Sequence, residues 1–275
     1  MSVITPVKIK SSDLELTKEM FLYQMNEAFL DSKKIGISRK HLSEFGFNKL
    51  ATVPGIGEVL YFDFSASISA LYLFQKRFID LVASFLTILI LLPFGLLISI
   101  FVLFDVGWPL FYLQHRLNEK GQKIFFIKFR SMRLGSDKDE VRMNSMEKFI
   151  NGEKSMDGSK KIINETLVSG TGKFLRKYSL DELPQFFCVL IGSMSLVGPR
   201  PCLKHEFDSY KDWHKLRLIA KPGCTGLWQV YGRSIVSFDE SVLMDIYYST
   251  QQNIFMDLKL IIKTIPVMIM GKGGI

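Results

Sequence analysis

The longest uncharged stretch of this chain, Leu81–Phe104, constrains the fold more than any other feature. Its 24 residues contain no Asp, Glu, Lys or Arg. As a straight helix they would be about 36 Å long, more than the roughly 30 Å of a bilayer's hydrocarbon core. A buried helix of a soluble protein does not need this length, so the sequence predicts a membrane helix.

Two details favour a helix that enters the membrane and returns to the same face. Pro93, near the middle of the run, removes a backbone hydrogen bond and favours a sharp kink. Lys76 and Arg77 precede the run, and His115, Arg116 and Lys120 follow it. Because positive charge tends to stay on the cytoplasmic side, we predict a re-entrant helix with both ends at the cytoplasmic face of the membrane. A single span and a fully buried soluble helix are the alternatives.

The net charge limits the classes of partner to expect, and the cysteines indicate the cellular compartment. The chain has 275 residues and a net charge of +8, which favours an anionic partner such as membrane lipid or a phosphorylated substrate. The cations do not gather on one helix face and no recognition motif is present, so nucleic acid is not expected. The 3 cysteines and 4 histidines match no metal or disulfide spacing. Reduced thiols in a cytosolic environment are the simplest interpretation.

Two adjacent carboxylates, Asp181 and Glu182, lie near a predicted helix start and are candidates for chemistry on a phosphate ester. One carboxylate would attack or coordinate while a metal and basic side chains hold the phosphates. The competing interpretation is structural. Ser179 and Glu182 have the spacing of a capping box, in which their side chains satisfy free backbone N–H groups at a helix start.

Several cations are candidates for holding the phosphates. Strand alternation predicts that Lys128 and Arg130 share one face of a strand. Arg200 lies between two prolines, which would present its guanidinium from a stiff loop. Arg176 precedes the carboxylates, and Arg233 follows a glycine-rich segment, Lys221–Gly232, whose glycines allow close backbone approach. A solvated surface is the alternative for each.

The remaining sequence predicts a mainly helical α+β fold with few strands. A hairpin is expected with strands near Leu110–His115 and Lys123–Phe129. Gly170–Gly172 is expected to be a turn. The segment Met256–Met270 carries an apolar stripe, Leu258, Ile261, Ile262 and Ile265, which is typical of an amphipathic helix in a membrane interface, with core packing as the alternative.

These segments together resemble the bacterial sugar transferase family, the monotopic polyprenyl-phosphate phosphoglycosyl transferases, from about Lys76 to Met270. The motifs are Lys76–Asp80, the apolar segment with Pro93, Gln114 with Arg116, Lys128–Met132, Leu180–Gln185, Met194–Pro201, Lys221–Gly226, Gln229–Arg233, and Asp245 with Tyr248. One position departs from the pattern. Asn118 stands where the family usually has Gly, and because Asn also tolerates positive φ, we expect the turn to survive.

The resemblance implies a division into residues 1–70, an extension of unknown role, residues 71–109, the membrane segment, and residues 110–275, the catalytic domain. It also implies that the membrane is the bacterial inner membrane. It implies that Asp181 attacks the β-phosphorus of a UDP-sugar, releases UMP, and passes the sugar phosphate to polyprenyl phosphate. Glu182, with Asp181, would bind Mg²⁺. Capsule, exopolysaccharide, O-antigen and glycoprotein glycan pathways stay open, as do the sugar and a homo-oligomeric state.

Two alternatives to this two-step transferase follow from the same residues. In the first, the chain is a catalytically inactive, membrane-attached scaffold or regulator of polysaccharide assembly. The intact pair of Asp181 and Glu182 argues against that alternative. In the second, transfer is direct and Asp181 acts only as a base or metal ligand.

Overall fold

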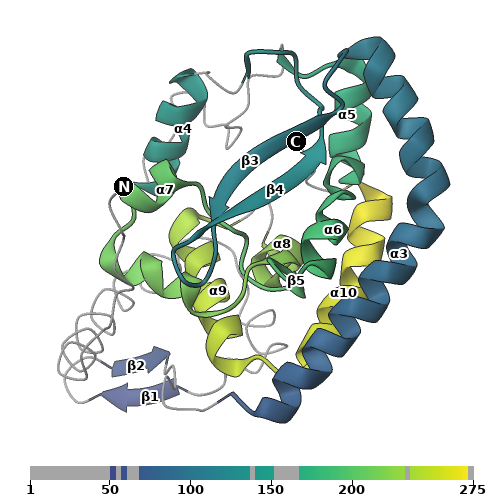
Figure 1. Ribbon diagram of the computed structural model, residues 1–275. Helices are drawn as coiled ribbons and strands as arrows, with labels where there is room; N and C mark the ends of the chain where they lie inside the picture. Colours follow the sequence, from purple (N-terminus) through teal and green to yellow (C-terminus); the bar gives the residue numbers. More distant parts are fainter. Residues whose placement is uncertain are drawn as a thin grey trace.

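The long apolar stretch forms most of helix α3 (Ala70–Asp105), which lies along one side of the protein in the computed structural model (Figure 1). The structure describes residues 50–53, 57–60, 68–136, 140–151, 167–232 and 236–271. The predicted extension therefore lies largely outside the described residues. Within it, the backbone forms a short antiparallel hairpin of β1 (Leu50–Val53) and β2 (Gly57–Leu60).

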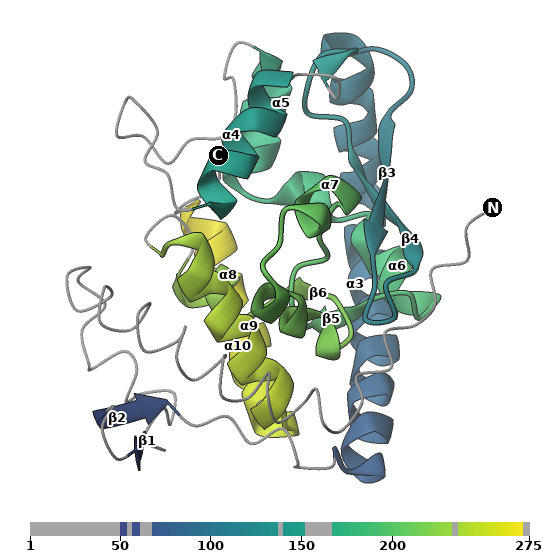
Figure 2. The same cartoon turned by 90° about the vertical axis from the view of Figure 1, so that its left-hand side faces the viewer.

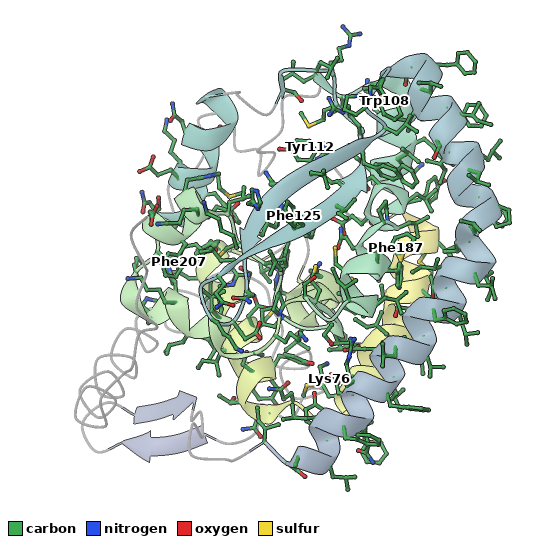
Figure 3. The ribbon with its side chains drawn as sticks, in the orientation of Figure 1. Lys76, Trp108, Tyr112, Phe125, Phe187 and Phe207 are labelled. Carbon is green, nitrogen blue, oxygen red and sulfur yellow. The ribbon has the colours of Figure 1, made fainter. Side chains whose placement is uncertain are left out.

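Helix α3 has the length and apolar composition to cross a membrane, and it continues as one helix through Pro93. Four residues spaced four apart, Tyr72, Lys76, Asp80 and Ser84, form a buried polar stripe against the protein. The large apolar side chains are mostly exposed, and Figure 3 shows side chains along α3 pointing away from the other elements. A polar inner side and an apolar outer side suit a helix in contact with lipid, so α3 indicates membrane association.

The predicted hairpin is confirmed as β3 (Phe111–Leu117) paired antiparallel with β4 (Lys123–Phe129). Its turn differs in detail from expectation. Asn118 does not adopt positive φ; its side-chain oxygen accepts hydrogen bonds from two backbone N–H groups of the turn, at 2.8 and 3.0 Å. Gly121 supplies the positive φ instead, at 68°. The side chain of Asn118 therefore shapes this turn.

After α4 (Glu140–Ile150), the chain forms α5 (Gly170–Lys177), the 3-10 turn η3 (Leu180–Glu182) and α6 (Gln185–Leu190). Helix α5 packs on both α3 and η3, and α6 packs on both α3 and β4. These contacts place η3 between the membrane helix and the hairpin.

The expectation of a turn at Gly170–Gly172 is wrong, because these residues form the first turn of α5. Ser169 caps the helix, its Oγ accepting a hydrogen bond from the Gly172 N–H at 2.9 Å. A Cβ at position 172 would lie 1.9 Å from the backbone oxygen of Ser131. Only glycine lets the backbone of α5 approach the backbone of Ser131 this closely. Gly172 therefore serves close packing inside the helix and does not form a separate turn.

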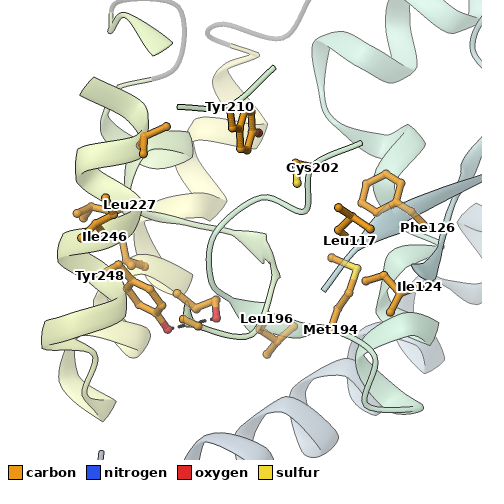
Figure 4. Close-up of a cluster of buried hydrophobic side chains, with 14 of the residues drawn as sticks. Leu117, Ile124, Phe126, Met194, Leu196, Cys202, Tyr210, Leu227, Ile246 and Tyr248 are labelled. Carbon is orange, nitrogen blue, oxygen red and sulfur yellow. Dashed lines mark hydrogen bonds between the residues drawn. The ribbon is translucent and has the colours of Figure 1, made fainter. Parts of the chain in front are cut away.

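The main core lies between the hairpin, α6, and the parallel pair of β5 (Ser195–Val197) and β6 (Gly223–Thr225). Figure 4 shows its buried side chains, which include Leu117, Phe126, Met194, Leu196, Leu227, Ile246 and Tyr248. Further helices are α7 (Lys204–Asp208), η4 (Asp212–Ile219), α8 (Leu227–Tyr231), α9 (Phe238–Gln251) and α10 (Ile254–Met270). Figure 2 shows β5 and β6 between the hairpin and helices α9 and α10.

Helix α10 is the predicted amphipathic helix. Its buried side includes Asp257 and Leu260, and Ile261 of the predicted stripe packs against the core. Five exposed large apolar side chains form one helical face: Phe255, Leu258, Ile262, Ile265 and Ile269. Met270, the last residue of the helix, is also exposed. Long helices with small two-stranded sheets confirm the predicted α+β class.

Candidate active site

The predicted carboxylate pair lies in η3, held against the membrane helix by apolar side chains on either side of it. Leu180 and Leu183 pack on the small cluster that contains Val102 of α3 and Leu175 of α5. This packing buries the turn, and only 6% of Asp181 is exposed. The candidate nucleophile is therefore largely shielded from bulk solvent.

The capping-box interpretation of Ser179 and Glu182 is wrong. Ser179 has φ 56° and ψ 25°, in the left-handed region, and its side chain makes no capping hydrogen bond. It follows the last turn of α5, and its N–H bonds to the Arg176 carbonyl. The Glu182 side chain turns to Arg200. A positive φ in a residue other than glycine is strained and is often found at functional sites.

Three of the predicted cations surround this pair. Lys128 lies on β4, which packs against η3. Arg176 lies in the last turn of α5, and Arg200 lies in the loop after β5. Burial and Glu182 raise the pKa of the Asp181 carboxyl, and the charges of all three cations oppose that rise. The structure thus brings together residues that are far apart in the sequence.

Glu182 and Arg200 form an ion pair at the edge of this site. Both Nη atoms of Arg200 lie 3.1 Å from Oε1 of Glu182, which accepts both hydrogen bonds. The two side chains are 25% and 29% exposed, in contrast to the buried Asp181. The guanidinium is thus oriented by Glu182 at a position that solvent can reach.

The two carboxyl groups have opposite pKa shifts. Burial raises the pKa of Asp181, and the neighbouring Glu182 charge raises it further. Burial would also raise the pKa of Glu182, but Arg200 and Lys128 outweigh it and hold that pKa below its usual range. Burial lowers the pKa of Lys128 to about 8, against the opposing effect of Asp181. Divergent pKa values in adjacent acids are common where the two have different roles.

Sequence reasoning assigned no site role to Arg116, which lies next to the site. Its Nη1 donates to the Pro201 carbonyl at 2.6 Å, and its Nε and Nη2 donate to Gln114 Oε1 at 3.2 and 3.1 Å. Burial lowers the pKa of Arg116 to about 10, and the charge of Arg200 adds to that effect. The available signal was the Gln-x-Arg spacing on a strand, which puts both side chains on one face.

Two other predicted cations have different outcomes. Arg130 follows β4; its backbone N–H donates to the Leu110 carbonyl, and its Nε is buried with no hydrogen-bond partner among the described residues. A role of Arg130 in holding the phosphates stays a prediction. Arg233 lies outside the described residues.

The predicted close backbone approach in the glycine-rich segment is confirmed where it meets the Arg200 loop. A Cβ on Gly198 would lie 2.2 Å from the Lys221 carbonyl oxygen. A Cβ on Gly223 would lie 2.1 Å from the Gly198 nitrogen. Any side chain at either position would push the loop that carries Arg200 away from β6.

The donor set of the site fits Mg²⁺ held jointly with a substrate. Asp181 and Glu182 supply carboxylate oxygens, and each raises the cost of charging the other, which a cation would relieve. Among the described residues, no group of three or more His, Cys, Asp or Glu side chains could hold a metal. Mg²⁺ is commonly bound through one or two carboxylates together with substrate phosphates.

A buried carboxylate next to a partly exposed one, with cations around them, on a domain packed against an apolar helix, is an arrangement suited to a membrane-associated enzyme with a phosphorylated substrate. Residues 71–271 match the sequence profile of the bacterial sugar transferase family, and the chain belongs to this family. The match includes α3, the hairpin, η3 and α10.

Three relatives illustrate this membership. The chain is 32% identical to galactosyl transferase CpsE of Streptococcus agalactiae serotype III (strain NEM316), over 99% of this chain and 61% of that protein. It is 36% identical to exopolysaccharide production protein ExoY of Rhizobium meliloti (strain 1021), over 72% of this chain and 87% of that protein. It is 37% identical to the undecaprenyl-phosphate galactose phosphotransferase of Salmonella typhimurium (strain LT2), over 73% of this chain and 42% of that protein. The chain thus spans less than two thirds of the first and third relatives.

Proposed function

We propose that this protein transfers a sugar-1-phosphate from a UDP-sugar to undecaprenyl phosphate and releases UMP. The observation that carries the proposal is the environment of Asp181, a buried carboxylate beside Lys128, Arg176 and Arg200. Such a cluster stabilises the negative charge of a diphosphate while keeping a carboxylate oxygen available for attack. The reaction would be the first membrane step of capsule, exopolysaccharide, O-antigen or glycoprotein glycan synthesis.

In the first step, Asp181 Oδ attacks the β-phosphorus of the donor. A new P–O bond forms to the carboxylate, and the bond from the β-phosphorus to the bridging oxygen breaks. UMP leaves with the electron pair of that bond, and the sugar phosphate remains on Asp181 as an acyl phosphate. Arg200 and Lys128 stabilise the charge that collects on the leaving phosphate and the β-phosphoryl oxygens. Attack requires the ionised carboxylate.

In the second step, a phosphate oxygen of undecaprenyl phosphate attacks the same phosphorus. The bond from phosphorus to Asp181 breaks, and the carboxylate is restored with its negative charge. The product is undecaprenyl diphosphate sugar. Neither step needs a general base, because both nucleophiles are already anionic. This accounts for an active-site cluster that is rich in cations, namely Lys128, Arg176 and Arg200.

When bound, Mg²⁺ would neutralise diphosphate charge and polarise the phosphoryl oxygens. Asp181 and Glu182 would hold it together with the donor. Arg200 keeps Glu182 ionised, because its charge helps lower the Glu182 pKa. Glu182 is thus prepared to hold a cation at neutral pH, and Asp181 is left as the attacking group.

The path of α3 supports a re-entrant anchor, with both ends at the cytoplasmic face. Near its start, Lys76 contacts β5, and at its end Asp105 contacts the first turn of α5. Both elements belong to the same folded unit, so a straight span with its two ends on opposite sides of a bilayer is hard to reconcile with these contacts. Single cysteines at Ile68 and Trp108, in a variant without native cysteines, should both react with a thiol reagent only when it reaches the cytoplasmic side.

The names of the relatives direct the choice of donor. Two of them are named for galactosyl or galactose-phosphate transfer. We therefore propose UDP-galactose as the donor, with UDP-glucose and UDP-N-acetylglucosamine as the competing hexose donors in the assay.

The decisive experiment measures UMP release by detergent-purified protein with Mg²⁺, undecaprenyl phosphate and each UDP-sugar in turn. We expect release with one preferred donor, loss on chelation by EDTA, and loss in Asp181→Asn. Without acceptor, mass spectrometry should find the phosphosugar on the peptide that contains Asp181. Release at the wild-type rate by Asp181→Asn would contradict the assignment. Release without a trapped adduct, and with Asp181 essential, would favour direct transfer.

A further inference from the structure

Strand β5 is held along one edge by another strand and along its other edge by side chains of α3. In the parallel pair with β6, Ser195 and Val197 are in register with Gly223 and Thr225, and the Ser195 N–H donates to the carbonyl of Pro222, the residue before β6, at 2.8 Å. The Leu196 N–H points the other way and donates to Asp80 Oδ1 at 2.9 Å. The Ser195 hydroxyl donates to the same oxygen at 3.1 Å. Asp80 thus acts as a substitute for a neighbouring strand.

Lys76, one helical turn before Asp80, holds the end of the same strand. Its Nζ donates to the Val197 carbonyl at 2.9 Å, and it also contacts the Tyr248 hydroxyl at 3.0 Å and Asp257 Oδ2 at 2.9 Å. Only 8% of Lys76 is exposed. All three donors of its ammonium group are therefore satisfied inside the protein, which is how a buried cation is tolerated.

The partners of Lys76 are fixed in turn. The Tyr248 hydroxyl donates to Asp257 Oδ1 at 2.6 Å, and the Tyr72 hydroxyl donates to Asp257 Oδ2 at 2.9 Å. Figure 3 labels Lys76 where α3 runs close to α10, and Figure 4 shows the Tyr248 ring reaching toward β5. We call Lys76, Asp80, Tyr248 and Asp257 the α3–β5 network. It joins the two helices with exposed apolar faces to one short strand.

This strand leads directly to Arg200. Val197 is the residue before the Gly198–Pro201 loop, whose arginine donates to Glu182. At the far end of the loop, Arg116 holds the Pro201 carbonyl. The loop is thus fixed at both ends by buried cations, one of them from the membrane helix.

We propose that Lys76 and Asp80 of the membrane helix are positioning residues for Arg200, acting through β5. This inference rests on the proposed function, because the role of Arg200 does. In this proposal α3 positions an active-site residue in addition to attaching the protein to the membrane. The N-terminal turns of α3 set the position at which the Arg200 guanidinium contacts the donor diphosphate. A change in how α3 packs on β5 would therefore change phosphate binding.

The activity test is a double-mutant cycle with Arg200→Lys, read as kcat/KM for the UDP-sugar. If Lys76 acts through Arg200, Lys76→Met should lower kcat/KM by roughly 10-fold or more in the wild-type background but by less than about 2-fold in the Arg200→Lys background. The loss should fall mainly on the donor KM or on kcat, with the acceptor KM unchanged. If the fold-losses of Lys76→Met and Arg200→Lys instead multiply in the double variant, the proposal is overturned.

Arg77 provides the matched control. It is the next residue on α3, also basic, and its Nη atoms donate to the Val189 and Leu190 carbonyls at the end of α6, at 2.7 and 2.8 Å. Arg77→Met removes a contact of α3 of the same kind but leaves β5 untouched. The fold-loss in kcat/KM caused by Arg77→Met should multiply with the fold-loss caused by Arg200→Lys in the double variant.

Hydrogen exchange tests the positioning without relying on turnover. In Lys76→Met, amide exchange over residues 195–203 should become faster while exchange over α6 is unchanged, and Arg77→Met should give the reverse. If the wild type releases no UMP, the proposed function has failed and this measurement alone decides the positioning. Unchanged exchange over residues 195–203 in a folded Lys76→Met protein would contradict it.

A second variant keeps the test decisive if Lys76→Met does not fold. Asp80→Leu is nearly isosteric and removes the oxygen that accepts both hydrogen bonds from β5, whereas Asp80→Asn retains an oxygen that accepts from Leu196. We expect Asp80→Leu to reproduce the faster exchange and the non-multiplying activity loss. Asp80→Asn should restore most of both. Equal effects of the two variants on exchange over residues 195–203 would count against the proposal.

Discussion

Asp105, the last residue of α3, accepts a hydrogen bond from the backbone N–H of Thr171 at 2.5 Å. Thr171 lies in the first turn of α5, where backbone N–H groups lack partners within the helix. Ser169 satisfies the N–H of Gly172, and Asp105 satisfies that of Thr171. The far end of the membrane helix thus caps the helix that carries Arg176.

We predict that Asp105→Ala destabilises the fold by about 1 kcal/mol, the usual cost of losing a capping side chain together with its favourable charge at a helix N-terminus. Thermal unfolding in detergent should show a lower Tm. Asp105→Asn keeps an acceptor oxygen and should lose less. Asp208, exposed and paired with Lys204 on α7, is the control, and Asp208→Ala should leave Tm nearly unchanged. An equal loss in both alanine variants would contradict the capping role.

The left-handed backbone at Ser179 gives a second prediction. Positive φ costs an L-residue about 1–2 kcal/mol, part of which glycine recovers. Ser179→Gly should therefore be as stable as the wild type or more stable by up to about 1 kcal/mol, and should keep its activity. Ser179→Val should be destabilised, because β-branching makes positive φ costlier. Chemical denaturation with a constant m-value would measure both; a stable Ser179→Val protein would contradict the reasoning.

The sequence predicted much of this site, because its motifs carry their own local chemistry. The hairpin follows from strand patterning around a polar turn, and strand alternation and the proline-flanked loop indicate Lys128 and Arg200 as candidates for holding phosphates. The left-handed Ser179 was not foreseen, since Ser and Glu at this spacing ordinarily predict a capping box. Only the three-dimensional fold showed that the Glu182 side chain turns to Arg200.

The roles of Lys76 and Asp80 were also not foreseen. From sequence alone, Lys76 is a charge that sets the topology of the membrane helix. The available signal was the polar spacing of Tyr72, Lys76, Asp80 and Ser84, which places four polar groups on one side of an apolar helix. Even so, the contact of Lys76 with Asp257 joins residues 181 apart in the sequence. No local pattern determines a pairing of that kind.

Arg116 is predicted to act by holding the Arg200 loop. Arg116→Met removes the donor to the Pro201 carbonyl while keeping much of the packing on Phe126, whose ring centroid lies 4.2 Å from the guanidinium carbon. Losing a charged hydrogen bond of this kind costs about 1.5–3 kcal/mol, or roughly 10- to 150-fold in kcat/KM if the loop is used in the transition state. Arg116→Lys should recover part of it. A steady-state UMP assay checks this, with Lys204→Ala as the control.

The lowered pKa of Lys128, about 8, predicts the alkaline limit of activity. The free enzyme loses the ammonium charge as pH rises through that value, so kcat/KM for the donor should fall above about pH 8. Lys128→Arg keeps its charge at higher pH and should shift the limit upward even if its maximal activity is lower. If the alkaline limit does not move in Lys128→Arg, a group other than Lys128 sets it.

His214 predicts an acid limit of stability that is separate from catalysis. The ring is fully buried; its Nδ1 accepts from the Lys211 backbone N–H at 3.2 Å, so the neutral ring carries its proton on Nε2, 3.0 Å from Asp239 Oδ1. Burial lowers the pKa of His214, although Asp239 opposes the shift.

Because the folded-state pKa lies below the unfolded value of about 6.5, the unfolded chain binds the extra proton first as pH falls. Stability is therefore retained above pH 6.5 and is lost below it. Tm should drop between pH 7.5 and 5.5, and His214→Asn should show a smaller drop. His205→Asn, on the exposed side of α7, is the control and should keep the wild-type slope. A drop of wild-type size in His214→Asn would show that another group controls the acid limit.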